Sequence, residues 1–155
     1  MACCPTEERI KGAFSTAKTS KVGTGATAKK VSTTIYVFAE ELEDDKIEIQ
    51  AVNENHVPTG PTRTISRDDL LRDFFPDPEY YHKTMLPQMR ELAKQIASGE
   101  RHLKNGQPFT AELSFANALN LDEQNIRANF GIGLVYLRRG EKEKALEVLR
   151  RLVTL

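Results

Sequence analysis

The sequence contains no tryptophan, only two cysteines and no excess of either charge, since 22 basic residues balance 22 acidic ones. A neutral chain creates no global field that would draw it to nucleic acid or to a membrane surface. No apolar run approaches the roughly 20 residues that span a bilayer, and the N-terminus lacks the apolar core of a signal peptide. These absences favour a cytoplasmic protein with one domain, or with one small domain and an appended array.

Residue patterns typical of catalytic sites or metal sites are also scarce. Cys3 and Cys4 are adjacent, and neighbouring cysteines rarely bond each other, so we expect reduced, exposed thiols. The three histidines, His56, His82 and His102, lie in three separate segments without paired ligand spacing. The chain has no Ser/His/Asp order, HExxH motif, CxxC pair or acidic metal loop. We therefore predict a protein that is not an enzyme and that holds no metal or cofactor.

Residues 1–31 are rich in Lys, Thr, Ala, Ser and Gly, with six basic residues against two acidic ones. They show no sustained apolar periodicity, which predicts a flexible basic arm. The glycine-rich part, 23–30, lacks two elements of a phosphate-binding loop. Its second glycine is Ala28 here, and the hydroxyl that would hold magnesium is Lys30. A linker is therefore the favoured interpretation of that part.

The residue composition of the sequence changes after Thr33. Ile35–Phe38 is rich in β-branched and aromatic residues, and Lys46–Val52 alternates apolar and polar side chains. The acidic turn Glu43–Asp45 lies between these two runs. Together they predict an antiparallel hairpin whose first strand is buried on both faces and whose second strand is half solvated.

A third strand and two helices are expected next. Pro58, Gly60 and Pro61 mark a turn, and Arg63–Ile65 follows as a short strand. Ser66–Asp69 is a variant of the capping box, which starts a helix that runs through Phe74. Proline in a first helical turn costs no hydrogen bond, so a further helix opens at Asp77–Pro78. Pro87 is expected to divide that helix into a connector and the beginning of the C-terminal part.

The C-terminal third repeats itself at a fixed spacing. Three pairs of small residues and two pairs of apolar residues are each separated by 34 positions, a period typical of helical-hairpin arrays. Two antiparallel helices per copy are therefore expected between residues 92 and 155. The pairs are Gly99 and Gly133, Gly106 and Gly140, Ala111 and Ala145, Leu103 and Leu137, and Phe115 and Leu149.

These residues resemble the tetratricopeptide repeat. That family places small residues where two helices cross, an aromatic residue on the first helix, and an alanine, an aromatic or apolar residue and a second alanine along the second helix. Ala111, Phe115 and Ala118 follow this pattern in the first copy, and Tyr136 and Ala145 follow it in the second. The departures are Gln95, Glu123 and Leu152, which replace an aromatic residue, a proline and an alanine.

The resemblance implies a groove lined by the first helix of each copy, which in the family holds a peptide. Members that capture a C-terminal carboxylate use Lys and Asn where this chain has Ile96 and Glu100, so that mode is contradicted. The groove expected here is apolar with a cationic border. Its lining residues are Ala93, Ile96, Glu100, Leu103 and Lys104 from the first copy, and Arg127, Phe130, Leu134, Leu137 and Arg138 from the second.

Something is expected to cover this apolar groove, because such patches are seldom left exposed on a monomer. The chain's own hairpin or its Asp69–Phe75 helix, a second copy of the protein, and an amphipathic helix of a partner are the three candidates. Two copies are fewer than the three that such arrays normally need. Val148, Leu152 and Leu155 would then face water, which favours a dimer or a longer natural chain.

Together these observations predict an α+β protein that acts as an adaptor or scaffold. It would bind a protein or peptide partner, or form a homodimer, through the apolar groove. The alternative is nucleic-acid or anionic-surface binding through the Lys18–Lys30 arm, which is less favoured because only one aromatic residue, Phe14, accompanies these lysines. The expected organisation is a flexible basic arm (1–31), a β-rich unit with a short helix (32–76), a connector helix (77–91) and two helical hairpins of the tetratricopeptide type (92–155).

Overall fold

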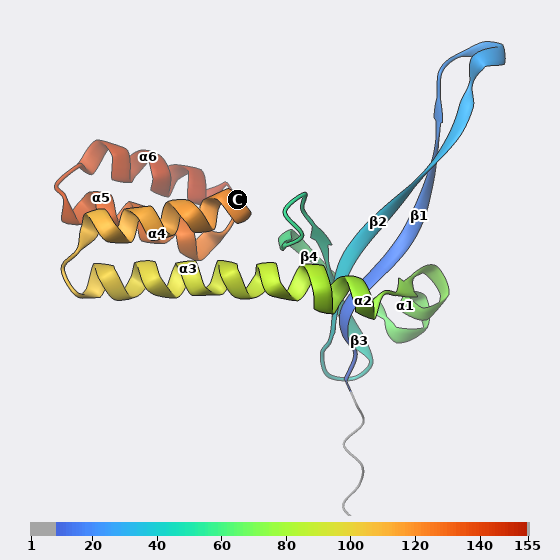
Figure 1. Cartoon of the computed structure of the whole chain (residues 1–155), viewed down its shortest axis with the longest axis horizontal. Helices are drawn as coiled ribbons and strands as arrows, with labels where there is room; N and C mark the ends of the chain where they lie inside the picture. The colour runs from blue at the N-terminus through green and yellow to red at the C-terminus, as the bar shows by residue number, and fades with distance from the viewer. Residues whose placement is uncertain (1–8, 155) are drawn as a thin grey trace, which may run out of the picture. The chain divides into compact units, whose positions relative to one another are not determined.

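The computed structural model describes residues 9–154, so Cys3, Cys4 and Leu155 lie outside the described residues. The chain is mixed α+β, as predicted, and forms two compact units (Figure 1). Of the described residues, the first unit comprises 9–51 together with Pro61–Tyr81, and it contains most of the sheet. The second unit comprises Val52–Gly60 together with 82–154, and it contains the long helices.

The sheet has five strands in the order β4-β3-β2-β1-β5. The expected hairpin is confirmed, because β2 and β3 pair antiparallel with Val37 opposite Ala51 and Glu41 opposite Ile47. The expected turn at Pro58–Pro61 is wrong, since these residues lie within a strand. The strands are β1 (Lys11–Val22), β2 (Lys29–Glu41), β3 (Lys46–Val52), β4 (Pro58–Ser66) and β5 (Phe75–Pro76).

A long hairpin stands where a flexible arm was predicted. β1 pairs with β2 antiparallel without interruption, from Lys11 opposite Glu40 to Val22 opposite Lys29, and Figure 1 shows the two strands as one extended ribbon. Of the residues that were taken as a linker, 23–28 form the turn, which includes the short 3-10 helix η1 (Gly25–Thr27), and Lys29 and Lys30 begin strand β2. The prediction failed because much of this hairpin is polar on both faces, so no apolar alternation reveals the strands.

Both faces of the sheet are covered where the hairpin joins it. Phe14 and Val37 are paired and lie in a buried cluster with Leu70 of helix α1 (Arg67–Asp73). Side chains of successive strand residues point to opposite faces, and Phe38 stacks on Tyr81 with ring centroids 6.1 Å apart. Burial of the β2 strand on both faces, expected from its sequence, is therefore confirmed at Val37 and Phe38.

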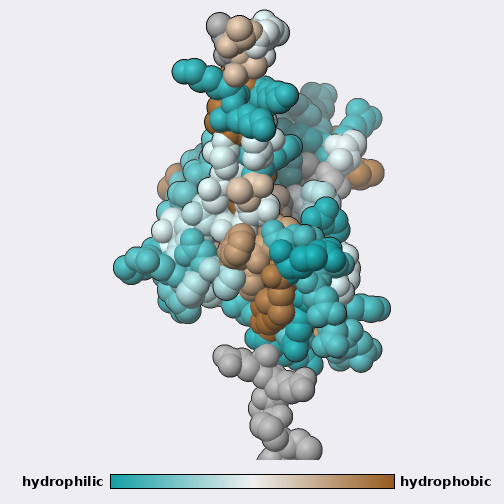
Figure 2. Space-filling model, turned by 90° about the vertical axis from the view of Figure 1, so that its right-hand side faces the viewer, coloured by the Kyte–Doolittle hydropathy of each residue, from teal (hydrophilic) through white to brown (hydrophobic). Residues whose placement is uncertain are grey.

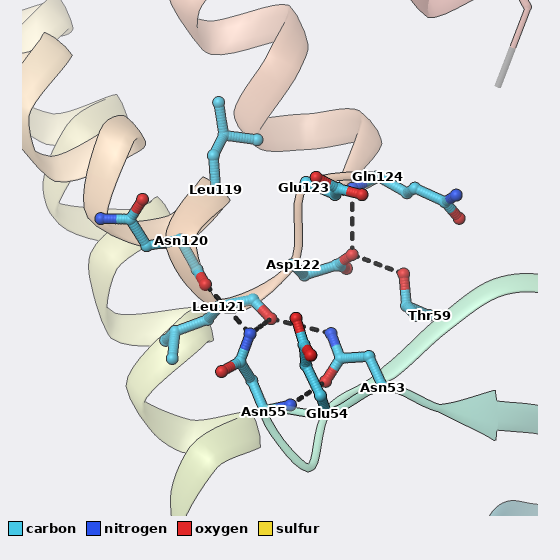
Figure 3. Close-up of a pocket in the computed structure, with 10 residues that line it drawn as sticks. All are labelled: Asn53, Glu54, Asn55, Thr59, Leu119, Asn120, Leu121, Asp122, Glu123 and Gln124. Atoms are coloured by element: carbon cyan, nitrogen blue, oxygen red, sulfur yellow. Dashed lines mark hydrogen bonds between the residues drawn. The ribbon is translucent and has the colours of Figure 1, made fainter.

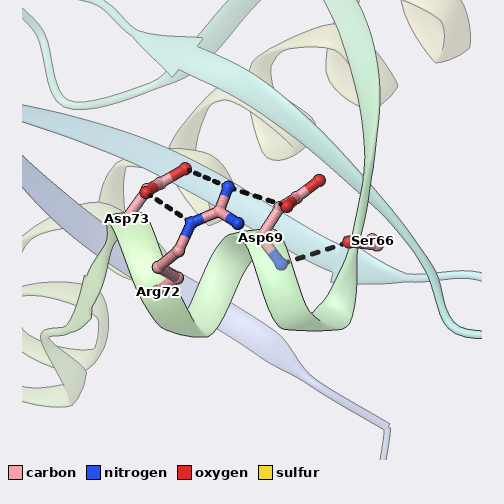
Figure 4. Close-up of polar contacts among 4 residues, drawn as sticks. All are labelled: Ser66, Asp69, Arg72 and Asp73. Atoms are coloured by element: carbon pink, nitrogen blue, oxygen red, sulfur yellow. Dashed lines mark hydrogen bonds and ion pairs between the residues drawn. The ribbon is translucent and has the colours of Figure 1, made fainter.

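Helix α1 begins with the predicted cap (Figure 4). The hydroxyl of Ser66 accepts a hydrogen bond from the backbone N–H of Asp69 at 3.1 Å. Arg72, in the last turn, pairs with Asp69 at 2.8 Å and with Asp73 at 3.1 Å. The Arg72 guanidinium holds the pKa of Asp73 below its usual range. These contacts satisfy the helix start and place a cation near the negative end of its dipole.

Three helical pieces follow one another where the chain passes from the first unit to the second, a boundary between Tyr81 and His82. In α2 (Pro78–Tyr80), Asp77 caps the helix by accepting from the backbone N–H of Tyr80 at 3.0 Å. The π-helical turn η2 (Tyr81–Met85) follows, and α3 (Leu86–Lys104) begins directly after it. Pro87 therefore lies in the first turn of α3, directly after the π-helical turn.

Four helices, α3 to α6, form most of the second unit. Each packs against the next one in sequence, and α3 also contacts α5. The two ends at Gly106 and Gly140 are alike, with φ angles of +74° and +77°. The backbone N–H of the next residue bonds five positions back in both cases, at 2.9 Å and 2.8 Å, which is a Schellman C-cap. The further helices are α4 (Pro108–Leu121), α5 (Ile126–Arg138) and α6 (Lys142–Val153).

The 34-residue spacing also reappears in the packing of these helices. A Cβ atom built on Gly99 would lie 2.7 Å from the ring of Phe115, and one built on Gly133 would lie 3.0 Å from Leu149. Gly131 is closest of all, because its added Cβ would lie 2.4 Å from the same Phe115 ring. Phe115 is fully buried, so its ring occupies the space that side chains on α3 and α5 would need.

Gly131→Ala tests this packing. Alanine gains about 1 kcal/mol of helix propensity, but the overlap with the ring is expected to outweigh this gain and to destabilise the protein by about 1–3 kcal/mol. In a Phe115→Leu background the same substitution should cost clearly less, because the smaller side chain leaves room. Chemical denaturation of the four variants measures the coupling. Equal costs in both backgrounds would contradict the packing.

A buried carboxylate joins the edge of the hairpin to helix α1. Glu41 is 7% exposed, and its Oε2 accepts from the backbone N–H of Ile10 at 2.9 Å. Its other carboxylate oxygen pairs with the guanidinium of Arg67. The Ile10 hydrogen bond lowers the pKa of Glu41 most, burial opposes this shift, and Arg67 adds to the lowering.

The lowered pKa makes the stability depend on pH. The folded chain binds this proton less tightly than the unfolded chain, so the contribution is complete above the ordinary glutamate pKa of about 4.3 and is lost as the pH falls through the lowered value. Glu41→Gln should therefore be less stable than the wild-type protein near neutral pH, with a gap that narrows in acid. Urea unfolding at several pH values measures the gap. The exposed neighbour Glu40→Gln serves as the control, and a gap independent of pH would rule out the linkage.

Candidate protein-binding surface

The predicted groove residues divide into two groups in the structure. Ile96 and Leu103 are only 4% and 8% exposed and belong to the buried core of the helical unit. Phe130 and Leu137, by contrast, are each 48% exposed on α5. The prediction that Ile96 and Leu103 line an open groove is therefore wrong.

The stripe of α3 that was expected to line the groove is used for helix packing instead. Leu92, Ile96, Gly99 and Leu103 are all buried and follow one another at helical spacing. They lie in the same cluster as Phe115 of α4. Alignment to a repeat family identifies which positions of a helix correspond to groove positions. How that helix crosses its neighbours then decides which of these side chains remain exposed.

A neighbouring stripe of α3 is exposed in its place. Its members are small or charged, at positions 93, 97, 100 and 104, which are four, three and four residues apart. The opposite row, on α5, is apolar at Phe130 and Leu137, with Leu134 partly buried between them. We call these two rows the α3–α5 surface. Its residues are Ala93, Ala97, Glu100 and Lys104 from α3, and Arg127, Phe130, Leu134, Leu137 and Arg138 from α5.

One ion pair crosses the α3–α5 surface. The Nη2 atom of Arg127 lies 2.6 Å from Oε1 of Glu100, and its Nε lies 3.1 Å from the same oxygen. Both side chains are exposed, so the pair contributes little to stability. It does neutralise the acidic group of this surface. Within residues 9–154, Lys104 and Arg138 have no acidic partner, so the surface combines apolar side chains with two unmatched cations.

A pocket lies where the loop between β3 and β4 meets the turn from α4 to α5 (Figure 3). The pocket has a volume of about 420 Å³. Its lining is mainly polar and includes the last carbonyl groups of α4. The lining residues are Asn53, Glu54, Asn55, Thr59, Leu119, Asn120, Leu121, Asp122, Glu123 and Gln124.

Polar groups of this pocket form hydrogen bonds with one another and tie the loop between β3 and β4 to the end of α4. We call the hydrogen bonds of Asn53 the clamp. The amide Nδ2 of Asn53 donates to the carbonyl of Leu121 at 2.8 Å, and its Oδ1 accepts from the backbone N–H groups of Asn55 and Val57. Val57 is 1% exposed and packs into the helical core. A helix end leaves its last carbonyls without helical partners, and Asn53 satisfies one of them.

The contacts of Asn53 were not predicted from the sequence. The nearby prolines were expected to form a turn, and Asn53 and Val57 carried no predicted role. Nothing near Asn53 in the sequence indicates its hydrogen bond, because the carbonyl that it bonds, at Leu121, lies 68 positions further along the chain.

No cluster of three or more His, Cys, Asp or Glu side chains able to hold a metal ion occurs in the part of the chain that the structure describes. None of the helices of residues 9–154 combines the length and apolar character that crossing a membrane requires.

Comparison with protein-family models, curated proteins and solved structures gave no match. The resemblance to the tetratricopeptide repeat therefore stays a prediction from the residues themselves.

The clamp gives a stability prediction. Asn53→Ala removes the shorter of the two hydrogen bonds to the carbonyl of Leu121, which keeps the one from Nδ2 of Asn55 at 3.4 Å. It also leaves two loop N–H groups without their side-chain acceptor, and we expect it to destabilise the protein by about 1–3 kcal/mol. The adjacent Glu54→Ala removes an exposed side chain and should change stability by less than about 0.5 kcal/mol. Thermal unfolding of both variants provides the comparison, and equal effects would refute the clamp.

Proposed function

We propose that this chain is a protein-interaction module of the tetratricopeptide type, and that its α3–α5 surface binds an amphipathic segment of a partner protein. The observation that carries the proposal is the half-exposure of Phe130 and Leu137 on one side of α5. These residues are seven positions apart, so they lie on the same helical face. Large apolar side chains in such a row are typical of surfaces that receive a helix.

The apolar contacts alone are too few for tight binding. Fully burying a large apolar side chain contributes about 1.5–3 kcal/mol, and each of these two is already about half buried. Association costs at least about 4 kcal/mol in lost freedom. A partner therefore needs further contacts, and the two cations of the surface supply them.

Lys104 and Arg138 define the chemistry of the partner. Their charges favour a segment that carries acidic residues beside an apolar stripe, because complementary charge raises the association rate and selects the partner. Glu100 does not oppose this preference, since its carboxylate is held by Arg127. An acidic amphipathic helix is the occupant that matches both properties.

A second copy of the protein is the other occupant to consider. A symmetric dimer places the same surface on both sides of the interface, so the cations of one protomer would approach those of the other. This repulsion makes the α3–α5 surface better suited to a foreign segment. The oligomeric state decides between the two.

Selection from a displayed library of helical peptides tests the proposal. We expect the selected peptides to carry apolar residues at positions i, i+3 or i+4, and i+7, with acidic residues beside them. Phe130→Glu combined with Leu137→Glu should weaken their binding at least about tenfold, which corresponds to about 1.4 kcal/mol. Fluorescence anisotropy with a labelled selected peptide measures this loss.

Leu113→Glu is the matched control, because Leu113 is 64% exposed on α4 and lies outside the surface. It should bind as the wild-type protein does. Peptides that bind the double variant unchanged would contradict the proposal. Light scattering that reports a dimer, dissolved by the double variant but not by Leu113→Glu, would instead assign the surface to self-association.

A further inference from the structure

The outer part of the β1–β2 hairpin extends beyond every other strand of the sheet. β1 pairs with β5 only at Phe14 and Ser15, and β2 pairs with β3 only from Val37 to Glu41. Further out, the two strands pair with each other alone, and residues 17–26 and 28–34 are all exposed. We call residues 17–34 the outer ribbon.

The outer ribbon concentrates positive charge in a neutral chain. It carries four lysines, and no acidic residue occurs between positions 9 and 39. Lys21 lies directly opposite Lys30 in the register, so both side chains project from one face. Lys18 and Lys29 project from the other face, because side chains alternate along each strand. Figure 2 shows hydrophilic side chains standing out on both sides of the ribbon.

This arrangement works against the ribbon's own stability. Like charges placed directly opposite each other destabilise a strand pair, and a two-stranded hairpin without further packing is marginal in water. Lysines on open edges do discourage pairing with other chains, but that role does not require two of them to face each other. An anionic partner would turn the repulsion between Lys21 and Lys30 into a favourable contact.

We propose that the outer ribbon binds duplex DNA by lying in its major groove, with the lysines contacting phosphates on both walls. The groove is about 12 Å wide and admits a two-stranded β-ribbon, and both of its walls carry phosphates. Lysines on both faces of the ribbon fit this geometry, whereas a partner that covered one face would leave two lysines unmatched. The major groove of duplex RNA is too narrow for such a ribbon.

The other side chains of the ribbon support this occupant. Most are Ser, Thr, Ala or Gly, which keep the ribbon slim, and its only large apolar residues are Val22 and Val31. The ribbon contains no Arg, Asn or Gln, so among the side chains that pair with a base edge through two hydrogen bonds it offers lysine alone. A second copy is disfavoured as the occupant, because it would bring two pairs of facing lysines together.

Anisotropy of a labelled duplex of mixed sequence, measured with the full chain at several salt concentrations, tests the inference. We expect a Kd of about 10⁻⁴–10⁻⁶ M near physiological salt, and a slope of log K against log salt of about −3.6 for four phosphate contacts. Lys21→Ala combined with Lys30→Ala should reduce the magnitude of that slope by about 2. Lys21→Arg with Lys30→Arg should keep it.

Lys94→Ala with Lys142→Ala is the control, since it removes two exposed charges from the helical unit and should leave binding unchanged. Phe130→Glu with Leu137→Glu should also bind DNA normally, which separates this inference from the proposed function. No binding at low salt, or equal binding by the Lys21/Lys30 alanine variant, would overturn it. Polyglutamate or anionic vesicles that bind as tightly as the duplex would also overturn it, in favour of an acidic protein or a membrane surface.

Discussion

The helical unit depends on one contact, the ring of Phe115 seated against Gly99 of α3 and Gly131 of α5. A methyl group on either glycine would overlap the ring, so the three helices can approach this closely only because both side chains are absent. Leu149 takes the equivalent place on Gly133 between α5 and α6. Protein interiors are packed too densely to absorb such overlaps, which makes these small residues the determinants of how the helices cross.

The same contact explains which side chains remain exposed. Because α3 turns Ile96 and Leu103 toward Phe115, its outer row is left with small and charged residues. The apolar character of the α3–α5 surface then comes from α5 alone, through Phe130 and Leu137. A groove that was expected to be apolar on both sides has its large apolar side chains on α5 alone and an unmatched cation on each helix, Lys104 on α3 and Arg138 on α5. This combination narrows the class of partner that fits it.

Local signals in the sequence were sufficient for the helices and for part of the sheet. The cap at Ser66 and the 34-residue spacing of the glycines depend on residues close together or repeated in register, and both lead to features found in the structure. Two other features could not be derived in this way. Strand β1 has a polar outer half without alternation, and the bond from Asn53 to Leu121 spans 68 positions. The first feature lacks the apolar pattern that marks a strand, and the second depends on a residue that is distant in the sequence.

The ribbon also shows why net charge is a poor guide to partners. Charges in solution are screened beyond about 8–10 Å at physiological salt, so an approaching polyanion responds to the lysines of the ribbon and not to acidic residues elsewhere in the chain. A sum of zero over 155 residues is compatible with a local cluster of four cations and no neighbouring carboxylate. The neutrality that argued against an anionic partner therefore loses its force once the lysines are known to share one exposed pair of strands.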